Sequence, residues 1–435
     1  MCACVKCVTP SNFLAMFSRP YGPSKRELSG SARILRTRYL VFLRCPDVCS
    51  LVYGCTKEVL EDMRIAQVVP LQVTVPPKAY GGTERVVFNL TEALVKLGHD
   101  VTLFASGDSR TSAHLVPGIE RAINFARNVD VAAHHVAMLQ DVYRRADSFD
   151  VIHSHLDYLT LPFLGMTPTS TVLTLHGRVD APEYQRVYRA YPDANYVAIS
   201  NSQRSDAPNV NWIGMAYHGI DVEDFTFYPK PGDYLCFVGR ISPEKRADRA
   251  IEIATRAGIP LKIAAKVDPT DEDYFNAEIK PLLKHPLVEY LGQLDEMSKR
   301  ELMGKSLALV LPIDWPEPFG MVFIEALACG TPVLTCPCGS VPELLRDGVT
   351  GYIRRTVAEL AALVPALSSI SRAGCRAYAK QRFDTRRMAL DYVNIYSQVQ
   401  GRRKLFGTDE QPAPANAPMF PAKITGDQIE RVALP

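Results

Sequence analysis

Two glutamates in the C-terminal half of the 435-residue sequence have the chemistry to bind sugar hydroxyls. Glu317 lies between Pro316 and Pro318, and Glu325 follows in a short helix expected over 321–329. The prolines exclude one continuous helix through both glutamates, so Glu317 is expected in an extended loop. Carboxylate oxygens accept hydrogen bonds, which suits the adjacent hydroxyls of a sugar or ribose. A single glutamate is more often a solvated surface residue, but the proline frame and the apolar neighbours of Glu325 favour a binding site.

Two cations follow the first expected strand of the C-terminal half. Arg240 comes after Gly239 at the end of strand 234–238, and Lys245 lies further on at a helix entry. A guanidinium binds phosphate through its planar fork and an ammonium acts as a point charge, so together they can neutralise a diphosphate. Lys245 by itself fits an exposed surface lysine equally well. The Gly-Arg pair at the strand end is a more specific indication of a diphosphate site than Lys245 alone.

Two glycine-containing segments are expected at helix N-termini, where backbone N–H groups can bind an anion. They are Gly81-Gly82-Thr83 and Gly339-Ser340-Val341-Pro342-Glu343. Glycines before helices also serve merely as turns, and the sequence alone does not decide between the two roles. Neither segment is Gly-x-Gly-x-x-Gly or a P-loop, which argues against a dehydrogenase and against a P-loop nucleoside triphosphatase.

Histidines end expected strands in the N-terminal half. His176 follows the strand 171–175, and His153 and His155 are weaker candidates at the end of their own strand. A lone histidine at a strand end is more often structural than catalytic. However, open α/β sheets bind ligands at the carboxyl ends of their strands, which makes a site role for His176 equally plausible.

Two groups of residues could in principle bind a metal, but both are better explained without one, and we predict no protein-bound metal. Asp268, Asp271 and Asp273 precede a helical pattern and fit a turn with N-cap residues. A zinc site drawn from four cysteines near the N-terminus is disfavoured, because the gap between the pairs is long and knuckle glycines are missing. The four are Cys4, Cys7, Cys45 and Cys49.

The elements that position these residues alternate between short β-branched runs and helical patterns, which is typical of parallel sheets built from βαβ units. The pattern breaks between Asp221 and Gly232, which indicates a linker. We therefore predict an α/β fold of two doubly wound domains, 63–221 and 222–384, facing each other across a cleft and followed by a helix over 385–400. The expected strands are 64–69, 101–104, 151–153, 171–175, 196–199 and one near 212–213, then 234–238, 261–264, 288–291, 308–311 and 332–334.

The two ends of the chain lack the signals of packed structure. Residues 1–62 show no sustained apolar period and are predicted to be an extension that is disordered or not native, with Met63 as the natural start. Residues 401–435 contain a Pro/Ala-rich stretch and are predicted to form a disordered tail.

Composition limits the partners. With 49 Lys+Arg and 47 Asp+Glu, the formal net charge is +2, which favours no nucleic-acid partner. No stretch reaches the roughly 18 uninterrupted apolar residues that a spanning helix needs, so a cytoplasmic protein is predicted. Basic residues at Arg144-Arg145 and Arg402-Arg403-Lys404 allow peripheral contact with the inner membrane face, although solvated charge is the commoner meaning.

In their order along the chain, these motifs resemble glycosyltransferase family 4, the retaining group 1 enzymes of GT-B fold. The resemblance covers about 63–400, and it departs from the family at Cys338 or Ser340, where another glycine is frequent. The motifs are the glutamate pair, Gly239-Arg240 with Lys245, Gly81-Gly82, Thr174-Leu175-His176-Gly177, His218-Gly219-Ile220-Asp221 and Gly339-Ser340-Val341-Pro342-Glu343.

The resemblance implies transfer of a sugar from a nucleoside-diphosphate donor to a hydroxyl, with retention of configuration and without a metal or other cofactor. The acceptor is a saccharide, a lipid-linked sugar or a small molecule. By the same resemblance, Arg240 and Lys245 hold the diphosphate, while Glu325 binds the nucleotide ribose. Glu317 binds hydroxyls of the transferred sugar and His176 lines the reaction centre.

The resemblance also implies that Gly82 brings the backbone close to the donor or acceptor. Phe319, Gly320 and Met321 lie between the two glutamates and are assigned to the donor site with them. Three alternatives stay open from the sequence: a sugar-nucleotide epimerase, a phosphorylase of the same architecture, and a non-catalytic protein that only binds sugar nucleotides.

Overall fold

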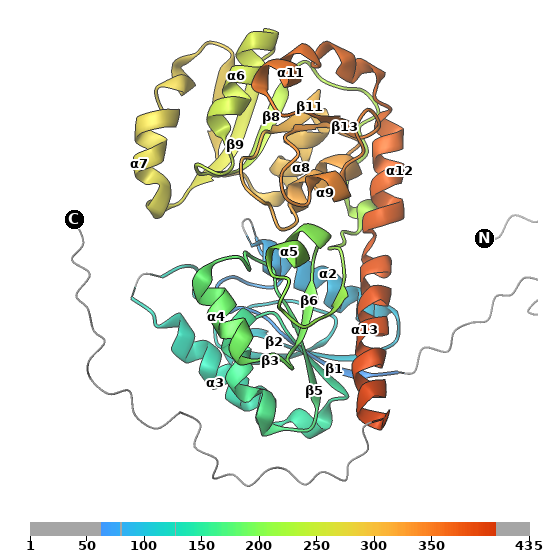
Figure 1. The fold of residues 1–435 in the computed structure, drawn as a ribbon. Coiled ribbons are helices and arrows are strands. Elements are labelled where there is room, and N and C mark those ends of the chain that lie inside the picture. Colours follow the sequence, from blue (N-terminus) through green and yellow to red (C-terminus); the bar gives the residue numbers. More distant parts are fainter. Residues whose placement is uncertain (1–61, 79–80, 127, 406–435) are drawn as a thin grey trace, which may run out of the picture. The chain divides into compact units, whose positions relative to one another are not determined.

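The computed structural model of the chain describes residues 62–78, 81–126 and 128–405 (Figure 1). The predictions for the N-terminal extension, including the zinc alternative, and for the tail beyond residue 405 lie outside this part of the chain. Two parallel sheets organise the described residues, one of seven strands and one of six.

The first sheet has the strand order β3-β2-β1-β4-β5-β6-β7. Its central strand β1 pairs on both sides, since Ile65 lies opposite Val101 of β2 and Val151 of β4. Residues 65–68 of β1 are all buried, which fits this position, because a central parallel strand is covered on both faces. The bounds are β1 Arg64–Val68, β2 Asp100–Ser106, β3 His114–Ile119, β4 Val151–Ser154, β5 Ser170–Thr174, β6 Asn195–Ala198 and β7 Trp212–Met215.

The second sheet has the order β10-β9-β8-β11-β12-β13. Strand β8 is central here, with β9 on one side and β11 on the other. The bounds are β8 Leu235–Ile241, β9 Leu261–Val267, β10 Val288–Gly292, β11 Ala308–Leu311, β12 Val333–Thr335 and β13 Gly351–Ile353.

Helices connect the strands. The α-helices are α2 Gly82–Lys96, α3 Val131–Arg144, α4 Pro182–Ala190, α5 Asn201–Asp206, α6 Ala247–Ala257, α7 Glu272–Tyr274, α8 Glu296–Lys305, α9 Met321–Ala328, α10 Val341–Leu344, α11 Val357–Ala362, α12 Arg372–Phe383 and α13 Thr385–Leu405. Short 3₁₀ segments lie at η4 Ala146–Ser148, η5 Asp157–Met166, η6 Val222–Asp224, η7 Pro269–Asp271, η9 Leu282–Lys284 and η10 Pro365–Ser369, and one π-helical segment at η8 Phe275–Ile279.

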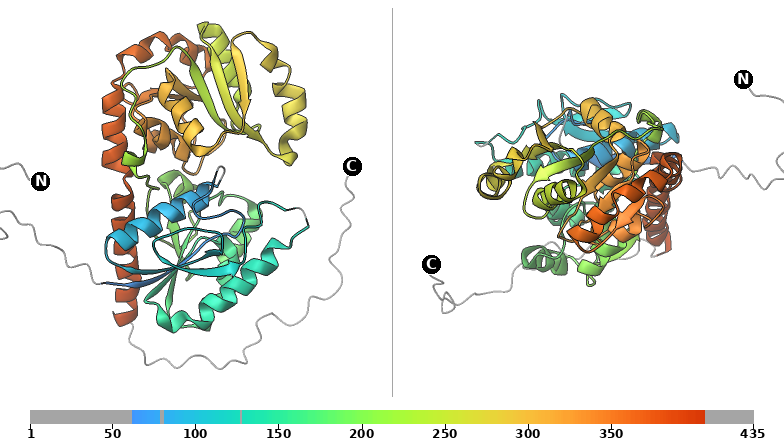
Figure 2. Two further views of the ribbon diagram at one scale, coloured as in Figure 1. Left: turned by 180° about the vertical axis from the view of Figure 1, so that it is seen from behind. Right: turned by 90° about the horizontal axis from the view of Figure 1, so that it is seen from above.

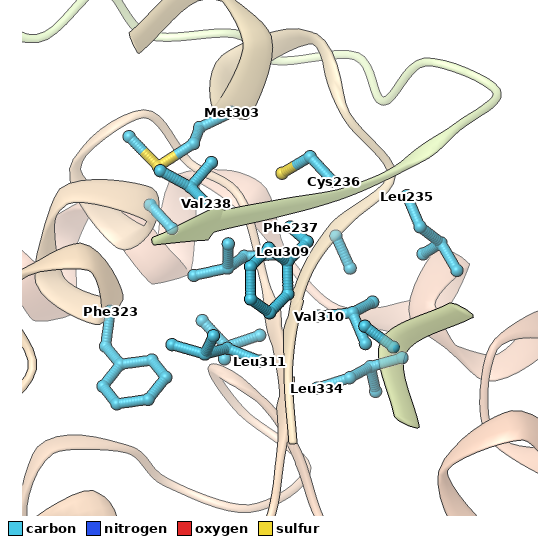
Figure 3. Packing of buried hydrophobic residues seen from close by; sticks show 14 of the residues in the cluster. Leu235, Cys236, Phe237, Val238, Met303, Leu309, Val310, Leu311, Phe323 and Leu334 are labelled. Carbon is cyan, nitrogen blue, oxygen red and sulfur yellow. The ribbon is translucent and has the colours of Figure 1, made fainter. Parts of the chain in front are cut away.

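The core around the second sheet is built from the side chains of β8 and β11. Phe237 and Leu309 are fully buried there and pack with Phe323 of α9 (Figure 3). Burying a large apolar side chain stabilises a fold by about 1.5–3 kcal/mol. This packing therefore fixes the strand ends from which the predicted site residues emerge.

Helix α13 follows the second sheet in the sequence but packs beside the first. It contacts α2, β5 and β7, and the views in Figures 1 and 2 agree on its place along that sheet. Where the chain crosses, the Ile220 N–H donates to the Phe383 carbonyl at 2.8 Å. Because of this return, residues near 395 reach the carboxyl edge of β4 and β5.

The structure differs from the sequence prediction at several points. Strands β3 and β13 were not predicted, and α13 runs on to Leu405. Gly82 is the first residue of α2 and does not precede it. Asp268 and Asp271 occupy N-cap positions, of η7 and α7, as predicted, but neither side chain accepts a capping hydrogen bond from the following segment.

Candidate active site

Most residues that the sequence assigned to the site line one cavity of about 580 Å³. The cavity walls come from both halves of the chain. The predicted residues in its lining are Gly82, His176, Arg240, Lys245, Glu317, Phe319, Gly320, Met321 and Glu325. The structure brings these residues together, and the role of each one remains a prediction.

The cavity lies where the strand order of each sheet reverses. Strand β1 neighbours β2 and β4, and β8 neighbours β9 and β11, so the loops after these strands leave in opposite directions and open a crevice. The loop after β1 leads to Gly82, while Arg240 is the last residue but one of β8 and the loop after β11 carries Glu317. His176 follows β5 at the same edge of the first sheet.

Two glycines shape the loop that carries Glu317. Gly320 has a φ of +86° at the start of α9, a left-handed conformation that favours glycine. Gly339 has a φ of +58°, and a Cβ there would lie 2.2 Å from the Glu317 backbone nitrogen. The next residue, Ser340, donates its backbone N–H to the Glu317 carbonyl at 2.9 Å. This close approach fixes the loop in its extended form.

The Glu317 carboxylate lies against cations and donors of the cavity wall. Lys245 Nζ forms an ion pair with Oε2 of Glu317, and Nε1–H of Trp315 donates to the same oxygen at 3.0 Å. The ammonium of Lys245 also lies 5.1 Å from the centre of the Trp315 ring. Lys245 is therefore not the exposed surface lysine that the sequence left open, because its side chain is 18% exposed.

Arg240 lies among three carboxylates at the end of β8. It forms an ion pair with Glu244, and its guanidinium is 3.6 Å from Oδ2 of both Asp268 and Asp271. Burial by itself raises the pKa of Glu244, but hydrogen bonds from the backbone, Ser242 and Arg240 outweigh it and leave the pKa below its ordinary value. The acids that the sequence assigned to helix caps thus position Arg240.

Glu325 belongs to a charged network that the sequence analysis missed. Lys299 Nζ lies 3.0 Å from Oε2 of Glu325 and 2.9 Å from Oε2 of Glu296, and Glu296 pairs with Arg85 of α2 at 3.2 Å. Burial lowers the pKa of Lys299, but Glu325 and Glu296 outweigh it and raise the pKa above its ordinary value. The only sequence signal was the spacing of Glu296 and Lys299 on one helix, which is common on solvated faces.

His176 lies in a cluster of uncharged rings. Its Nε2 is 2.8 Å from Nδ1 of His155, and its ring stacks on His218 at a centroid distance of 5.1 Å. Burial lowers the pKa of His176 to about 3, so the ring carries no charge at neutral pH. His153 and His155, the weaker candidates, are buried behind His176 and do not line the cavity.

Only one of the two predicted anion-binding helix starts reaches the cavity. Gly81, Gly82 and Thr83 at the start of α2 are in its lining, whereas Gly339 and Ser340 are not. The short helix α10 that follows Ser340 faces elsewhere, and its Glu343 accepts hydrogen bonds from the backbone N–H groups of α5 at 2.7 and 2.8 Å. The second segment therefore supports the Glu317 loop, and its role as an anion site stays a prediction.

The described residues contain neither a group of metal ligands nor a helix suited to spanning a membrane. Within 62–78, 81–126 and 128–405, no three His, Cys, Asp or Glu side chains are grouped so as to hold a metal ion. In the same part of the chain, no helix combines the length and apolarity that crossing a bilayer requires.

Family models match both halves of the chain. The model described as Glycosyltransferase Family 4 matches residues 80–223, and the model described as Glycosyl transferases group 1 matches residues 224–382. The two matches meet at the linker between the sheets.

Two curated relatives and a solved structure are similar to the chain over about three quarters of its length. The chain is 26% identical to a glycogen synthase of Mycobacterium tuberculosis (74% of this chain, 92% of the relative). It is 27% identical to a phosphatidyl-myo-inositol mannosyltransferase of Mycolicibacterium smegmatis (78% and 95%). The crystal structure of Anabaena HepE in complex with UDP and glucose has the same fold, with a TM-score of 0.61 at 18% identity (77% and 100%).

Proposed function

Because the chain belongs to the group 1 glycosyltransferases and has the GT-B fold, we propose that it transfers a sugar with retention of configuration and without a metal ion. The donor is a nucleotide sugar and the acceptor is a hydroxyl group. One observation carries the finer proposal: a single cavity joins two cations at the end of β8, two glutamates and an uncharged histidine from the opposite half of the chain.

The diphosphate of the donor is bound by Arg240 and Lys245. Both cations are held in place by carboxylates before the donor enters, so they lose little side-chain entropy on binding. A diphosphate that pairs with Lys245 releases Glu317, whose carboxylate then accepts hydrogen bonds from hydroxyls of the transferred sugar. The backbone N–H groups at the start of α2 add further donors for negative charge.

Departure of the charged diphosphate is the difficult step of the reaction. Arg240 and Lys245 stabilise the negative charge that builds on the leaving oxygen, and such fixed groups contribute most where water is excluded. The surroundings keep His176 uncharged, so it contributes hydrogen bonding and shape at the reaction centre. Glu325, oriented by Lys299, accepts hydrogen bonds from the ribose hydroxyls.

The first experiment is a thermal-shift screen with nucleoside diphosphates and their glucose and mannose conjugates. UDP and UDP-glucose come first, because HepE, which shares the fold, was crystallised with UDP and glucose. A ligand at 100 times its Kd stabilises the folded chain by about 2.7 kcal/mol. If no nucleotide in the panel raises the Tm, the donor site is wrong.

Product analysis then tests the reaction itself. Incubation with donor and acceptor should give a glycoside whose anomeric configuration, measured by NMR, matches that of the donor. Activity that is unchanged after dialysis against EDTA supports the metal-free proposal, and activity restored only by a divalent cation contradicts it. The comparisons do not favour the epimerase, phosphorylase and non-catalytic alternatives, and incubation with donor alone or with donor and phosphate checks the first two.

The acceptor class and the cellular location are tested separately. We propose a saccharide, lipid-linked or small-molecule acceptor and a cytoplasmic enzyme with peripheral contact to the inner membrane face. Sedimentation with vesicles of anionic lipid should retain part of the protein and release it at high salt, because such contact is electrostatic. Full recovery in the supernatant at low salt contradicts the membrane contact.

A further inference from the structure

A chain of buried hydrogen bonds leads from His176 to helix α13. His176 Nε2 lies 2.8 Å from His155 Nδ1, and His155 Nε2 lies 2.8 Å from Oε1 of Gln67. Nε2 of Gln67 in turn donates to the hydroxyl of Tyr396 at 3.2 Å. Gln67 and Tyr396 are fully buried and His155 is 2% exposed, so solvent water does not compete for these bonds.

Each histidine in this chain holds one ring proton. Burial lowers the pKa of His176 to about 3, and burial together with the neighbouring histidines lowers the pKa of His155 well below its ordinary value. Both rings are therefore uncharged at neutral pH. A neutral imidazole has one N–H donor and one bare nitrogen that accepts. The position of each proton then follows from the partners.

The amide oxygen of Gln67 sets the direction of the chain. A carbonyl oxygen only accepts, so the proton of His155 lies on Nε2 and its Nδ1 is bare. The bare Nδ1 requires that His176 donate from Nε2–H, which leaves Nδ1 of His176 without a proton. That Nδ1 is buried and has no hydrogen-bond partner among the described residues, although the ring lines the cavity.

We propose that Gln67, anchored by Tyr396, is a positioning residue that holds His176 in its Nε2–H tautomer, so that Nδ1 accepts a hydrogen bond from a hydroxyl of the bound sugar once donor binding uncovers that side of the ring. The ligand in this proposal rests on the proposed function. The tautomer does not, because it is a property of the free protein. A buried acceptor without a partner is costly, and a ligand hydroxyl that meets it removes that cost.

Tyr396 fixes the orientation of the Gln67 amide, because its hydroxyl binds the amide nitrogen. Its oxygen accepts from Gln67 and its O–H donates to Nδ1 of His153 at 2.7 Å. His153 then donates from Nε2–H to Thr174 Oγ1 at 2.7 Å, and Thr174 contacts the hydroxyl of Tyr392 at 2.9 Å. Without the Tyr396 hydroxyl, the amide can turn and present N–H to His155, which reverses both tautomers.

The test is the ¹⁵N NMR spectrum of the histidine-labelled full chain, in which protonated and bare ring nitrogens have well-separated shifts. The His176 signals are assigned by their loss in His176→Gln. We expect the Nε2–H tautomer in the wild type and a mixture in Gln67→Met and Tyr396→Phe. Tyr392→Phe is the matched control, because Tyr392 is equally buried on the same helix but contacts Thr174, at the end of the hydrogen-bond series that is farthest from His176.

Kinetics supply the second readout. Tyr396→Phe should lower kcat about tenfold, the value of one lost hydrogen bond, while the Kd for the nucleoside diphosphate stays unchanged. A wild-type spectrum with the proton on Nδ1 of His176 overturns the proposal without any variant. So does a Tyr396→Phe spectrum identical to that of Tyr392→Phe. Absence of sugar transfer by the wild type would instead contradict the proposed function and leave the tautomer measurement intact.

Discussion

The two walls of the cavity differ in how they hold their polar groups. On the wall from the first sheet, His176 and His218 are uncharged rings that stack on each other, and a hydrogen bond joins His176 to the sheet behind. On the wall from the second sheet, Arg240 and Lys245 are held by ion pairs with carboxylates. Apart from Glu84 and Arg85 of α2, which also line the cavity, charge is thus concentrated on the second wall, while His176 and His218 present shape and neutral hydrogen bonding.

This difference matches two adjoining parts of a nucleotide sugar, the diphosphate and the sugar. The diphosphate is an anion and needs fixed positive charge, whereas the sugar carries only neutral hydroxyls. A charged histidine on the first wall would add a cation that the sugar does not need, and desolvation of the buried ring prevents it. In the proposed function, the cations of the second wall bind the leaving diphosphate, Glu317 of the same wall binds the transferred sugar, and His176 adds neutral hydrogen bonding from the first wall.

The largest expected effect comes from removing charge on the second wall. Arg240→Ala should lower kcat on the order of 10²-fold or more, because a fixed group that stabilises developing charge is lost. Steady-state kinetics measure the effect. Arg249→Ala is the matched control, because Arg249 pairs with Asp314 at 2.7 Å and is not in the cavity lining. Full turnover of Arg240→Ala would remove Arg240 from the catalytic role.

The uncharged state of His176 should affect how the free energy of unfolding depends on pH. The folded pKa of His176 is about 3 and its ordinary value is 6.5, so the unfolded state takes up the proton first as pH falls. The contribution of the uncharged His176 ring to the free energy of unfolding is complete above pH 6.5. It is lost as pH falls from 6.5 toward 3, by up to about 1.4 kcal/mol per pH unit. His176→Gln should flatten the pH profile by that amount.

Urea unfolding between pH 7 and pH 4 measures this slope. The exposed His114 of β3 gives the control, and His114→Gln should leave the slope as in the wild type. Parallel curves for His176→Gln and the wild type would show that the ring is not held uncharged by the fold.

The ribose assignment predicts an intermediate effect. Glu325→Gln should raise the Kd of the nucleoside diphosphate about tenfold, since hydrogen bonds to a charged acceptor are replaced by weaker ones. Lys299 keeps Glu296 as its partner, so the fold should tolerate the change. Calorimetric titration measures the Kd, with Glu301→Gln on an exposed ion pair as the control. An unchanged Kd for Glu325→Gln contradicts the ribose role.

The smallest effect is expected at Gly82. A Cβ there would meet no atom within 4 Å, so Gly82→Ala should change the free energy of unfolding by less than about 0.5 kcal/mol. If the backbone approaches the ligand closely, the added methyl should still weaken nucleotide-sugar binding a few-fold. Thermal unfolding with and without the donor separates the two effects, and Gly401→Ala in α13 serves as the control. Equal donor stabilisation in both variants would refute the close approach.

Much of the fold was predictable because parallel strands carry a strong apolar signal. The strands that were missed, β3 and β13, lie at the edges of their sheets and pair on one side only. Strand β3 contains Pro117 and Gly118, and β13 has three residues, so neither shows the buried pattern of a central strand. Their existence depends on the neighbouring strand more than on their own sequence.

The sequence by itself determined many of the side chains at the cavity, although not Arg85, Glu296 and Lys299. In a parallel sheet the carboxyl ends of all strands share one edge, so Arg240 and Glu317 were bound to meet at the second sheet and His176 to lie at the same edge of the first. The packing of the two sheets then brings these edges to one cavity. The glycines and prolines around Glu317 carried similar local information, because they restrict the backbone directly.

Only the tertiary structure decided what these side chains contact. The pairs Lys245 with Glu317, Arg85 with Glu296, and Gln67 with Tyr396 are separated by 72, 211 and 329 residues. Local periodicity tells which face of an element is buried, but not which distant element covers it. The ion pairs of one wall and the hydrogen-bond chain behind the other therefore followed from the packing of helices and sheets, which no local pattern specifies.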